Sequence, residues 1–437
     1  MKKVSLFLGF AFMASMVFAQ NSATVNQTND GNKANVTQSG PKNTAQVDQV
    51  GSSNFVTVDS KGTDNTATVV QNGSRNGDYG KPNWGFLKQD GNNNIATLKE
   101  GLLGGTVSND NDGFIDQKGN GNTATMEIMG SNHNFVNHGI TQIQNEATLG
   151  NTATIKQSSY NNDMDVRQEG SANVVNGTTQ GSNDQFFVGQ HGINNNATVS
   201  QIGDNNGEYA SGFNIGTTGD TWNRITQTGS DNIGSVAQGS NNRFKMEQYG
   251  VTNTAKISQL GNNVVTTLQD GDLNIIAGYS SDVAEFAIGA SMEAKQYGSD
   301  NKLYVSTAGS LTVNQGKLAQ DGNHNTIKYI QTSTGSATLD QDGNSNLIWL
   351  NNTSAATASI DIDQTGDGNV VASFAGDVAS GARSAATFAG ASLTIDQKGA
   401  GSNLLNLNSA GADAVIDVMQ DGTNNWASVN QSTVIVP

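Results

Sequence analysis

One short alternating pattern recurs along the sequence, and it constrains the fold more than any other feature of the chain. Residues 242–271 show it three times, with Asn first, two apolar or medium-sized residues next and Gln last, on alternate positions. The copies are Asn242, Phe244, Met246 and Gln248; Asn253, Ala255, Ile257 and Gln259; and Asn263, Val265, Thr267 and Gln269. Such alternation predicts β-strands with one buried face. Each buried face then begins and ends with an amide, although burying an unpaired amide is costly.

The spacing of the copies predicts a β-solenoid. Gln27, Gln38 and Gln49 are 11 residues apart, so a seven-residue strand N-x-φ-x-φ-x-Q alternates with a short link, usually x-G-x-x. Many successive Q-x-G-x-x-N segments lie 21 to 24 residues apart, which indicates two strands and two links per coil. Periods of this length are typical of solenoids. We therefore expect an all-β fold of strand–turn–strand–turn coils stacked in parallel register, an amyloid-like cross-β arrangement.

Stacking would satisfy the buried amides. With coils about 4.8 Å apart, Asn would lie over Asn and Gln over Gln, and each amide could donate to one neighbour and accept from the other. The amide positions predicted to form these ladders are Asn21, Gln27, Asn43, Gln49, Asn195, Gln201, Asn232, Gln238, Asn242, Gln248, Asn253, Gln259, Asn263, Gln269, Asn325, Gln331, Asn425 and Gln431. The link glycines expected to supply the positive φ of a tight turn are Gly40, Gly51, Gly192, Gly229, Gly250, Gly322 and Gly422.

The composition suits one continuous solenoid better than several globular domains. Only 35% of the 437 residues are hydrophobic, and 52 are Gly. The absence of Cys excludes disulfides, and the presence of only three Pro suits uninterrupted backbone ladders. We expect a single solenoid over residues 20–437, with protruding loops near residues 72–82, 100–112, 205–220, 277–289 and 373–390.

Residues 1–19 have the features of a signal peptide. Lys2 and Lys3 precede an apolar stretch, and Val17 and Ala19 fit a small-residue cleavage site before Gln20. A transmembrane anchor is the alternative, but the stretch is short for a span. The signal peptide predicts export. The net charge is −16 and no basic run occurs, so we expect no nucleic-acid partner.

The two ends of such a stack are open sheet edges, which can template the next molecule. A head-to-tail contact that does not close into a ring forms a filament. We therefore predict that the partner of this chain is a second copy of itself, in a head-to-tail homopolymer.

The repeat Q-x-G-x-x-N-x-A-x-x-x-Q resembles the curlin repeat of the curli amyloid fibres on bacterial surfaces. Full matches are Gln38 to Gln49, Gln190 to Gln201, Gln248 to Gln259 and Gln420 to Gln431. The resemblance implies secretion through the periplasm to the cell surface, and assembly into fibres that serve biofilm matrix and adhesion. It also implies that amides at the repeat ends carry self-assembly. Implied partners are a related curli subunit or nucleator and an outer-membrane secretion channel. Curli subunits have a non-repeat leader after the signal peptide, whereas the repeats here begin at Asn21.

Other chemistry has weaker support. The recurring Gln-Asp-Gly could align carboxylates for calcium, but Asp is also an ordinary turn residue. The histidines, His133, His138, His191 and His324, lack a metal-ligand spacing. We expect no catalytic residues, metal or cofactor. Two alternatives stay open, a monomeric cell-surface β-solenoid adhesin and a polysaccharide-acting β-helix enzyme.

Overall fold

The computed structural model of the protein describes most of the region predicted to form the solenoid. It covers residues 20–76, 85–101, 108–109, 111–131, 139–144, 149–160, 162–206, 223–240, 242–259, 264–277, 284–286, 291–307, 316–331, 335–352, 358–372, 387–388, 393–399, 403–410 and 416–432. The predicted signal peptide, residues 1–19, lies outside these ranges. Over the ranges given, the secondary structure is β-strand with turns, and no helix long and apolar enough to cross a membrane occurs.

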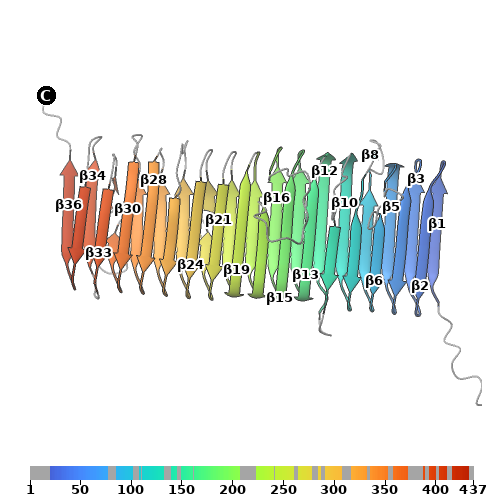
Figure 1. The fold of residues 1–437 in the computed structure, drawn as a ribbon, viewed down its shortest axis with the longest axis horizontal. Helices are drawn as coiled ribbons and strands as arrows, with labels where there is room; N and C mark the ends of the chain where they lie inside the picture. Colours follow the sequence, from blue (N-terminus) through green and yellow to red (C-terminus); the bar gives the residue numbers. More distant parts are fainter. Residues whose placement is uncertain are drawn as a thin grey trace, which may run out of the picture.

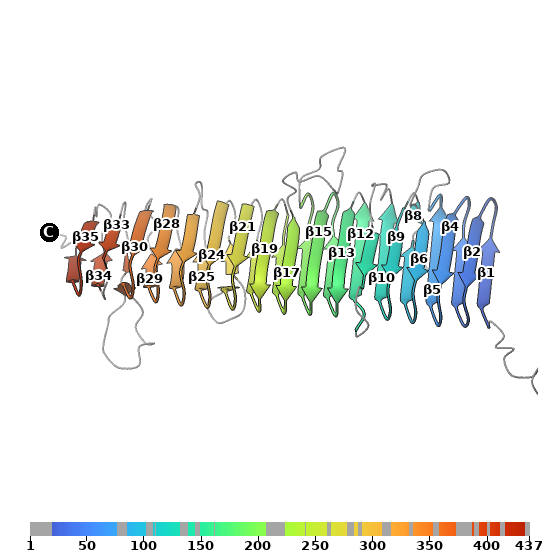
Figure 2. The same cartoon turned by 60° about the horizontal axis from the view of Figure 1, so that its bottom comes forward.

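The described strands form two parallel sheets that face each other along one elongated stack (Figures 1 and 2). The first sheet has 20 strands. They are β1 (Ser22–Thr28), β3 (Thr44–Val50), β5 (Thr66–Ser74), β7 (Ile95–Glu100), β8 (Ser108–Asn109), β10 (Thr123–Ser131), β12 (Thr152–Tyr160), β14 (Val174–Gln180), β16 (Asn196–Ile202), β18 (Ile233–Gln238), β20 (Thr254–Gln259), β22 (Ile275–Ala277), β23 (Ala284–Phe286), β25 (Lys302–Thr307), β27 (Thr326–Gln331), β29 (Leu347–Asn352), β31 (Val370–Ala372), β32 (Thr387–Phe388), β34 (Leu404–Ala410) and β36 (Trp426–Ser432).

The second sheet has 16 strands in the described ranges. They are β2 (Lys33–Ser39), β4 (Phe55–Lys61), β6 (Phe86–Asp90), β9 (Phe114–Lys118), β11 (Gly139–Ile143), β13 (Asp163–Ser171), β15 (Gln185–Ile193), β17 (Arg224–Ser230), β19 (Arg243–Val251), β21 (Val264–Asp270), β24 (Ser291–Tyr297), β26 (Gly316–Asp321), β28 (Gly335–Asp342), β30 (Ala358–Thr365), β33 (Leu393–Lys398) and β35 (Ile416–Asp421). Successive strands alternate between the sheets, except that β7 and β8, β22 and β23, and β31 and β32 follow one another in the first sheet. Each of these three pairs shares one level, so each coil contributes one level to each sheet. The predicted all-β solenoid is confirmed.

The register follows the sequence repeat. In the pair β19–β21, Phe244 lies beside Val265, Met246 beside Thr267 and Gln248 beside Gln269. A slip by one residue would turn every side chain to the opposite face of its sheet. The links between the strands therefore vary in length, while side chains within each strand alternate strictly between the inner and the outer face.

The core is a thin layer between the two sheets. In β19 the inward residues Phe244, Met246 and Gln248 are fully buried, while the residues between them are partly exposed. Most strands contribute two apolar side chains to this layer, as Ala45 and Val47 do in β3. The interior therefore resembles a steric zipper, with amides at the ends of most strands.

Most of the described turns use two residues with positive φ, of which the sequence analysis anticipated one. Gly250 has φ +107°, as expected for a link glycine, and Thr252, directly before Asn253, has φ +60°. The same second position is occupied by Asp64 before Asn65 and by His324 before Asn325. At these three positions a residue other than Gly adopts the left-handed conformation directly before a buried Asn.

Three of the five segments predicted as loops contain short strands that pair within the first sheet. β8 lies in the segment near 100–112 and pairs with β5. β23 lies in the segment near 277–289 and pairs with β20 and β25, and β32 in the segment near 373–390 pairs with β29. Of the segment near 72–82, residues 72–74 belong to β5. Residues 77–84 and 207–222, which include most of the loops predicted near 72–82 and 205–220, lie outside the described ranges.

Candidate functional site

The glutamines form an unbroken hydrogen-bonded ladder along much of the second sheet. Each Nε2 donates to the Oε1 of the glutamine one coil later, at 2.8–3.1 Å. The ladder runs through Gln89, Gln117, Gln142, Gln168, Gln190, Gln227, Gln248, Gln269, Gln296, Gln320, Gln341 and Gln364. All the bonds point from the N-terminal coil to the C-terminal coil, so the ladder has a direction.

Contacts across the core fix the orientation of these amides. The second N–H of Gln89 donates to the carbonyl of Thr66 in β5 and to that of Asn94 before β7, both at 3.0 Å. Because a carbonyl can only accept, the nitrogen of the amide must face these groups. Gln71 Nε2 in the first sheet likewise donates across the core to the backbone carbonyls of Phe55 in β4 and of Asn76, which precedes β6, at 2.9 and 3.2 Å.

The asparagines form ladders of a different kind from the one predicted. The Asn Oδ1 accepts from the backbone N–H of the Asn one coil later, at 2.8–3.2 Å, in an unbroken series from Asn21 to Asn369. The Asn Nδ2 donates mainly to the carbonyl of the link glycine one coil later, as from Asn253 to Gly271 at 2.6 Å. Direct amide–amide bonds occur at only some described steps, such as Asn195 to Asn173 at 3.1 Å. The short Asn side chain reaches the backbone of the turn, so its oxygen pairs with a backbone N–H and its nitrogen with a glycine carbonyl.

The link glycines are required by this stacking as well as by their φ. A Cβ at Gly250 would lie 2.2 Å from the carbonyl oxygen of Gly271, and one at Gly51 would lie 1.8 Å from that of Gly73. Heavy atoms cannot approach so closely, so a side chain would displace the carbonyl that the Asn amide binds. Asn and Gly therefore act together in each turn.

Carboxylates replace amides at two ladder positions that the sequence analysis missed. Glu100 accepts from Gln71 Nε2 at 2.7 Å, in the register position of a glutamine. Asp184 takes the place of an asparagine, with Oδ1 accepting from the N–H and Nδ2 of Asn206 at 3.0 Å. The spacing could have revealed both, because Asp184 lies 22 residues from Asn162 and from Asn206.

Both carboxyls are fully buried, which favours their neutral form. Burial raises the pKa of Glu100 well above its usual range, against the hydrogen bond from Gln71, and the charge of Asp112 raises it further. Burial also raises the pKa of Asp184 to about 6, against the two hydrogen bonds from Asn206. We therefore expect the ladders to respond to pH at these two positions.

Most of the predicted amides lie where the repeat places them. Asn43, Gln49, Asn195, Gln201, Asn232, Gln238, Asn242, Gln248, Asn253, Gln269 and Asn325 are buried. Asn425 is half-buried, and Asn21 and Gln27 are exposed at the N-terminal end. Gln259 pairs in register with Gln238, while Gln331 and Gln431 belong to β27 and β36; the surroundings of these three side chains lie outside the described part of the structure. Asn263 lies outside the described residues altogether.

Each end of the described stack presents strand edges that pair with no other described strand. β1 pairs with β3 alone and β2 with β4 alone; at the other end, β36 pairs with β34 alone and β35 with β33 alone. Figure 1 shows β1 and β36 at the two extremes of the stack. The edges of the strands at both ends therefore retain unused backbone donors and acceptors.

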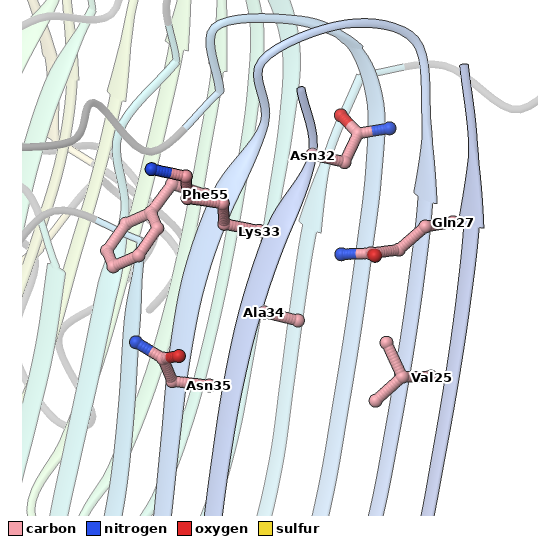
Figure 3. A pocket seen from close by; sticks show the side chains of 7 residues that line it. All are labelled: Val25, Gln27, Asn32, Lys33, Ala34, Asn35 and Phe55. Atoms are coloured by element: carbon pink, nitrogen blue, oxygen red, sulfur yellow. The ribbon is translucent and has the colours of Figure 1, made fainter. Parts of the chain in front are cut away.

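The N-terminal end is also hollowed. A hollow of about 400 Å³ there is lined by Val25, Gln27, Asn32, Lys33, Ala34, Asn35 and Phe55. In Figure 3, Gln27 and Ala34 point into the space between β1 and β2, whereas Phe55 and Asn35 lie on the other side of β2. The core layer of the first coil thus opens to solvent.

This fold and these ladders define a class of protein, a two-sheet parallel β-solenoid held by internal amide ladders. Residues 40–73, which span the turn before β3 through most of β5, match the family model described as the curlin associated repeat. The match confirms the resemblance inferred from the sequence, and residues 40–73 contain a curlin associated repeat. That family consists of structural proteins, the extracellular subunits of curli. No curated protein matches the chain.

Proposed function

We propose that the chain is a secreted structural protein that assembles head to tail into curli-like amyloid fibres on the cell surface. Residues 1–19 would direct export, and the fibres would contribute to biofilm matrix and adhesion. A related curli subunit or nucleator and an outer-membrane secretion channel are the further partners that the family resemblance supports.

The carrying observation is that the first coil leaves open the positions that later coils bury. Val25 is 44% exposed, whereas Val47, its register partner one coil later, is fully buried. Ala23 is likewise exposed, while Ala45 is buried. A docked coil would remove these apolar groups from water and would pair the free backbone edge of β1 at the same time.

The direction of the glutamine ladder favours head-to-tail growth over joining of like ends. In the first sheet, Gln27 Nε2 donates to Gln49 Oε1 at 2.6 Å and Gln49 Nε2 donates to Gln71 Oε1 at 2.7 Å, so these amides point in the same direction as the ladder of the second sheet. Its Oε1 is the group to which a preceding coil would donate. Two N-terminal ends brought together would instead oppose acceptor to acceptor.

Fibre formation by purified residues 20–437 tests the proposal. We expect fibres that bind amyloid dyes and give a meridional reflection at about 4.7–4.8 Å. A chain that stays monomeric for days at high concentration would contradict the proposal and favour the monomeric adhesin.

A pair of glutamine substitutions separates docking from folding. Gln27→Ala removes an exposed group at the docking end and one hydrogen bond to Gln49, so we expect slower seeded elongation with a monomer that stays folded. Gln248→Ala interrupts a buried ladder between Gln227 and Gln269, so we expect a less stable monomer, by about 1–3 kcal/mol. Equal slowing of elongation by both variants, with equally folded monomers, would exclude growth by end-stacking of solenoids.

A further inference from the structure

The two sheets interleave by half a coil. Gln71 in β5 donates to the carbonyl of Phe55 in β4 and to that of Asn76, which precedes β6. Gln89 in β6 donates in the same way to Thr66 in β5 and to Asn94, which precedes β7. Each strand therefore faces the gap between two strands of the opposite sheet, and each end of the stack is a step of half a coil.

The described stack begins and ends in the same sheet. The first sheet contains both β1 and β36, whereas the second begins with β2 and ends with β35. Three levels of the first sheet consist of two short strands each, namely β7 with β8, β22 with β23 and β31 with β32. The first sheet therefore has one level more than the second, and the number of half-coils in the described stack is odd.

This parity determines how a second copy fits. At the C-terminal end, β35 lies half a coil below β36; at the N-terminal end of an incoming copy, β1 lies half a coil below β2. The steps match if β1 docks on β35 and β2 docks on β36. Docking β1 on β36 would leave β35 and the incoming β2 about 9–10 Å apart, twice the strand spacing, with one level of the second sheet empty.

We propose that successive subunits in the fibre are related by a half turn about its axis, so that the first sheet of one subunit continues the second sheet of the next. This inference rests on the proposed head-to-tail assembly. A half turn keeps the strands parallel, because the strands of the two sheets run in opposite directions, and it exchanges the positions of the sheets. The superhelix of the chain then passes through the junction without interruption.

The residues at the junction suit this arrangement. Ile416 and Val418 occupy the two apolar positions of β35, and Gln420 occupies its amide position. Docking of β1 would place Ala23 over Ile416, Val25 over Val418 and Gln27 over Gln420. In the other sheet, the amide positions Gln38 of β2 and Gln431 of β36 come into register. Apolar residues continue apolar columns and amides continue amide columns.

The fibre symmetry follows from the same count. Sixteen strands in the second sheet correspond to sixteen coils, and β36 adds half a coil. At about 4.8 Å per coil, one subunit advances the fibre by about 80 Å, and the full repeat is two subunits, about 160 Å. The half turn adds to whatever gradual twist the stack itself has.

Labelling at a single introduced cysteine tests the half turn, since the chain has no Cys of its own. Ala237→Cys places a thiol on the exposed outer face of β18 in the first sheet. Fibres of this variant labelled with maleimide gold should show particles alternating between opposite sides, with neighbours on one side about 160 Å apart. Thr394→Cys on the exposed outer face of β33, in the second sheet, is the matched control and should give the same alternation.

Electron cryomicroscopy of the unlabelled fibre gives the second readout. We expect each subunit to be rotated by about 180° relative to the preceding one, in addition to the twist of the coils, with both sheets continuous at each junction. Fibres with all gold on one side at about 80 Å intervals, or with an empty level in the second sheet, would overturn the half turn and leave the proposed function standing. Failure of the chain to form any fibre would overturn both.

Discussion

Replacement of Asp184 by Asn should stabilise the coils around it at neutral pH and have little effect in acid. At the neighbouring ladder position, Asn162 Nδ2 donates to the carbonyls of Ser158 and Gly181, at 2.7 and 2.9 Å. Asp184 Oδ2 takes the place of that donor and has no hydrogen-bond partner. A carboxylate there directs a second acceptor toward backbone acceptors, whereas a protonated carboxyl or an amide can donate to them.

The magnitude follows from the pKa. The pKa of Asp184 rises from its ordinary value of 3.8 to about 6 in the folded chain. Below 3.8 the carboxyl is protonated in both states and imposes no penalty; the penalty grows as the pH rises toward 6 and is complete above it. A shift of about two units corresponds to about 3 kcal/mol. We expect about 2 kcal/mol, because the exposed turn at Asp204 admits solvent that screens part of the charge.

Hydrogen exchange measured by mass spectrometry suits this test, because a solenoid opens locally and one global free energy does not describe it. We compare Asp184→Asn with the parent chain at the same pH, in peptides from β13 to β16. At pH 7 the variant should exchange about 30-fold more slowly, which corresponds to 2 kcal/mol. At pH 3.5 the two should agree within about twofold.

Asp204→Asn is the matched control, since Asp204 is exposed and its Oδ1 accepts from the N–H of Ser182, a bond that an amide oxygen preserves. We expect little change at either pH. Equal protection by Asp184→Asn at pH 7 and pH 3.5 would refute the reasoning, because the gain would then come from something other than removal of a buried charge.

Three further perturbations test other parts of the structure. Gly250→Ala should destabilise its coil by at least about 2–3 kcal/mol in urea unfolding, because the new Cβ would lie 2.2 Å from the carbonyl oxygen of Gly271. In the control Gly121→Ala, the nearest atom would be 3.6 Å from the new Cβ, so we expect a loss of only about 1 kcal/mol. Glu100→Gln should slow hydrogen exchange in β5 and β7 at pH 7 but not in acid, since burial raises the pKa of Glu100; an equal effect at both pH values would contradict this. One residue inserted within β20 should abolish assembly, because it turns the following side chains outward. One residue inserted within 207–220 should leave assembly intact. Equal seeded growth of the two variants would contradict the strand assignment.

The sequence by itself was sufficient to predict the fold class and most of the buried face. Apolar and amide residues on alternate positions predict a strand with one buried face, and the 11-residue spacing predicts two strands per coil. Ala255, Ile257 and Gln248 could therefore be placed without coordinates. The reason is that a solenoid is built from nearest-neighbour contacts, which a repeating sequence states again in each unit.

The tertiary structure decided what each amide bonds to. A Gln side chain is long enough to reach the amide of the next coil, while that of Asn is held close to the turn, where backbone N–H groups and glycine carbonyls are nearer. The sequence pattern shows the two amides as equivalent ends of a strand, and only the turn geometry, with its second positive φ at residues such as Thr252, separates their roles.

The structure also decided which exceptions matter. Glu100 and Asp184 lie at positions that the repeat spacing indicates, but only the structure shows that their carboxyls are fully buried in the ladders. Whether the described stack contains an odd or even number of half-coils likewise depends on β8, β23 and β32, which share levels with other strands instead of adding new ones. Sequence periodicity determines the repeating unit of the stack, because that unit is local in the chain. The form of the two ends of the stack depends on how strands pair across the inserted segments, and this pairing joins residues far apart in the chain.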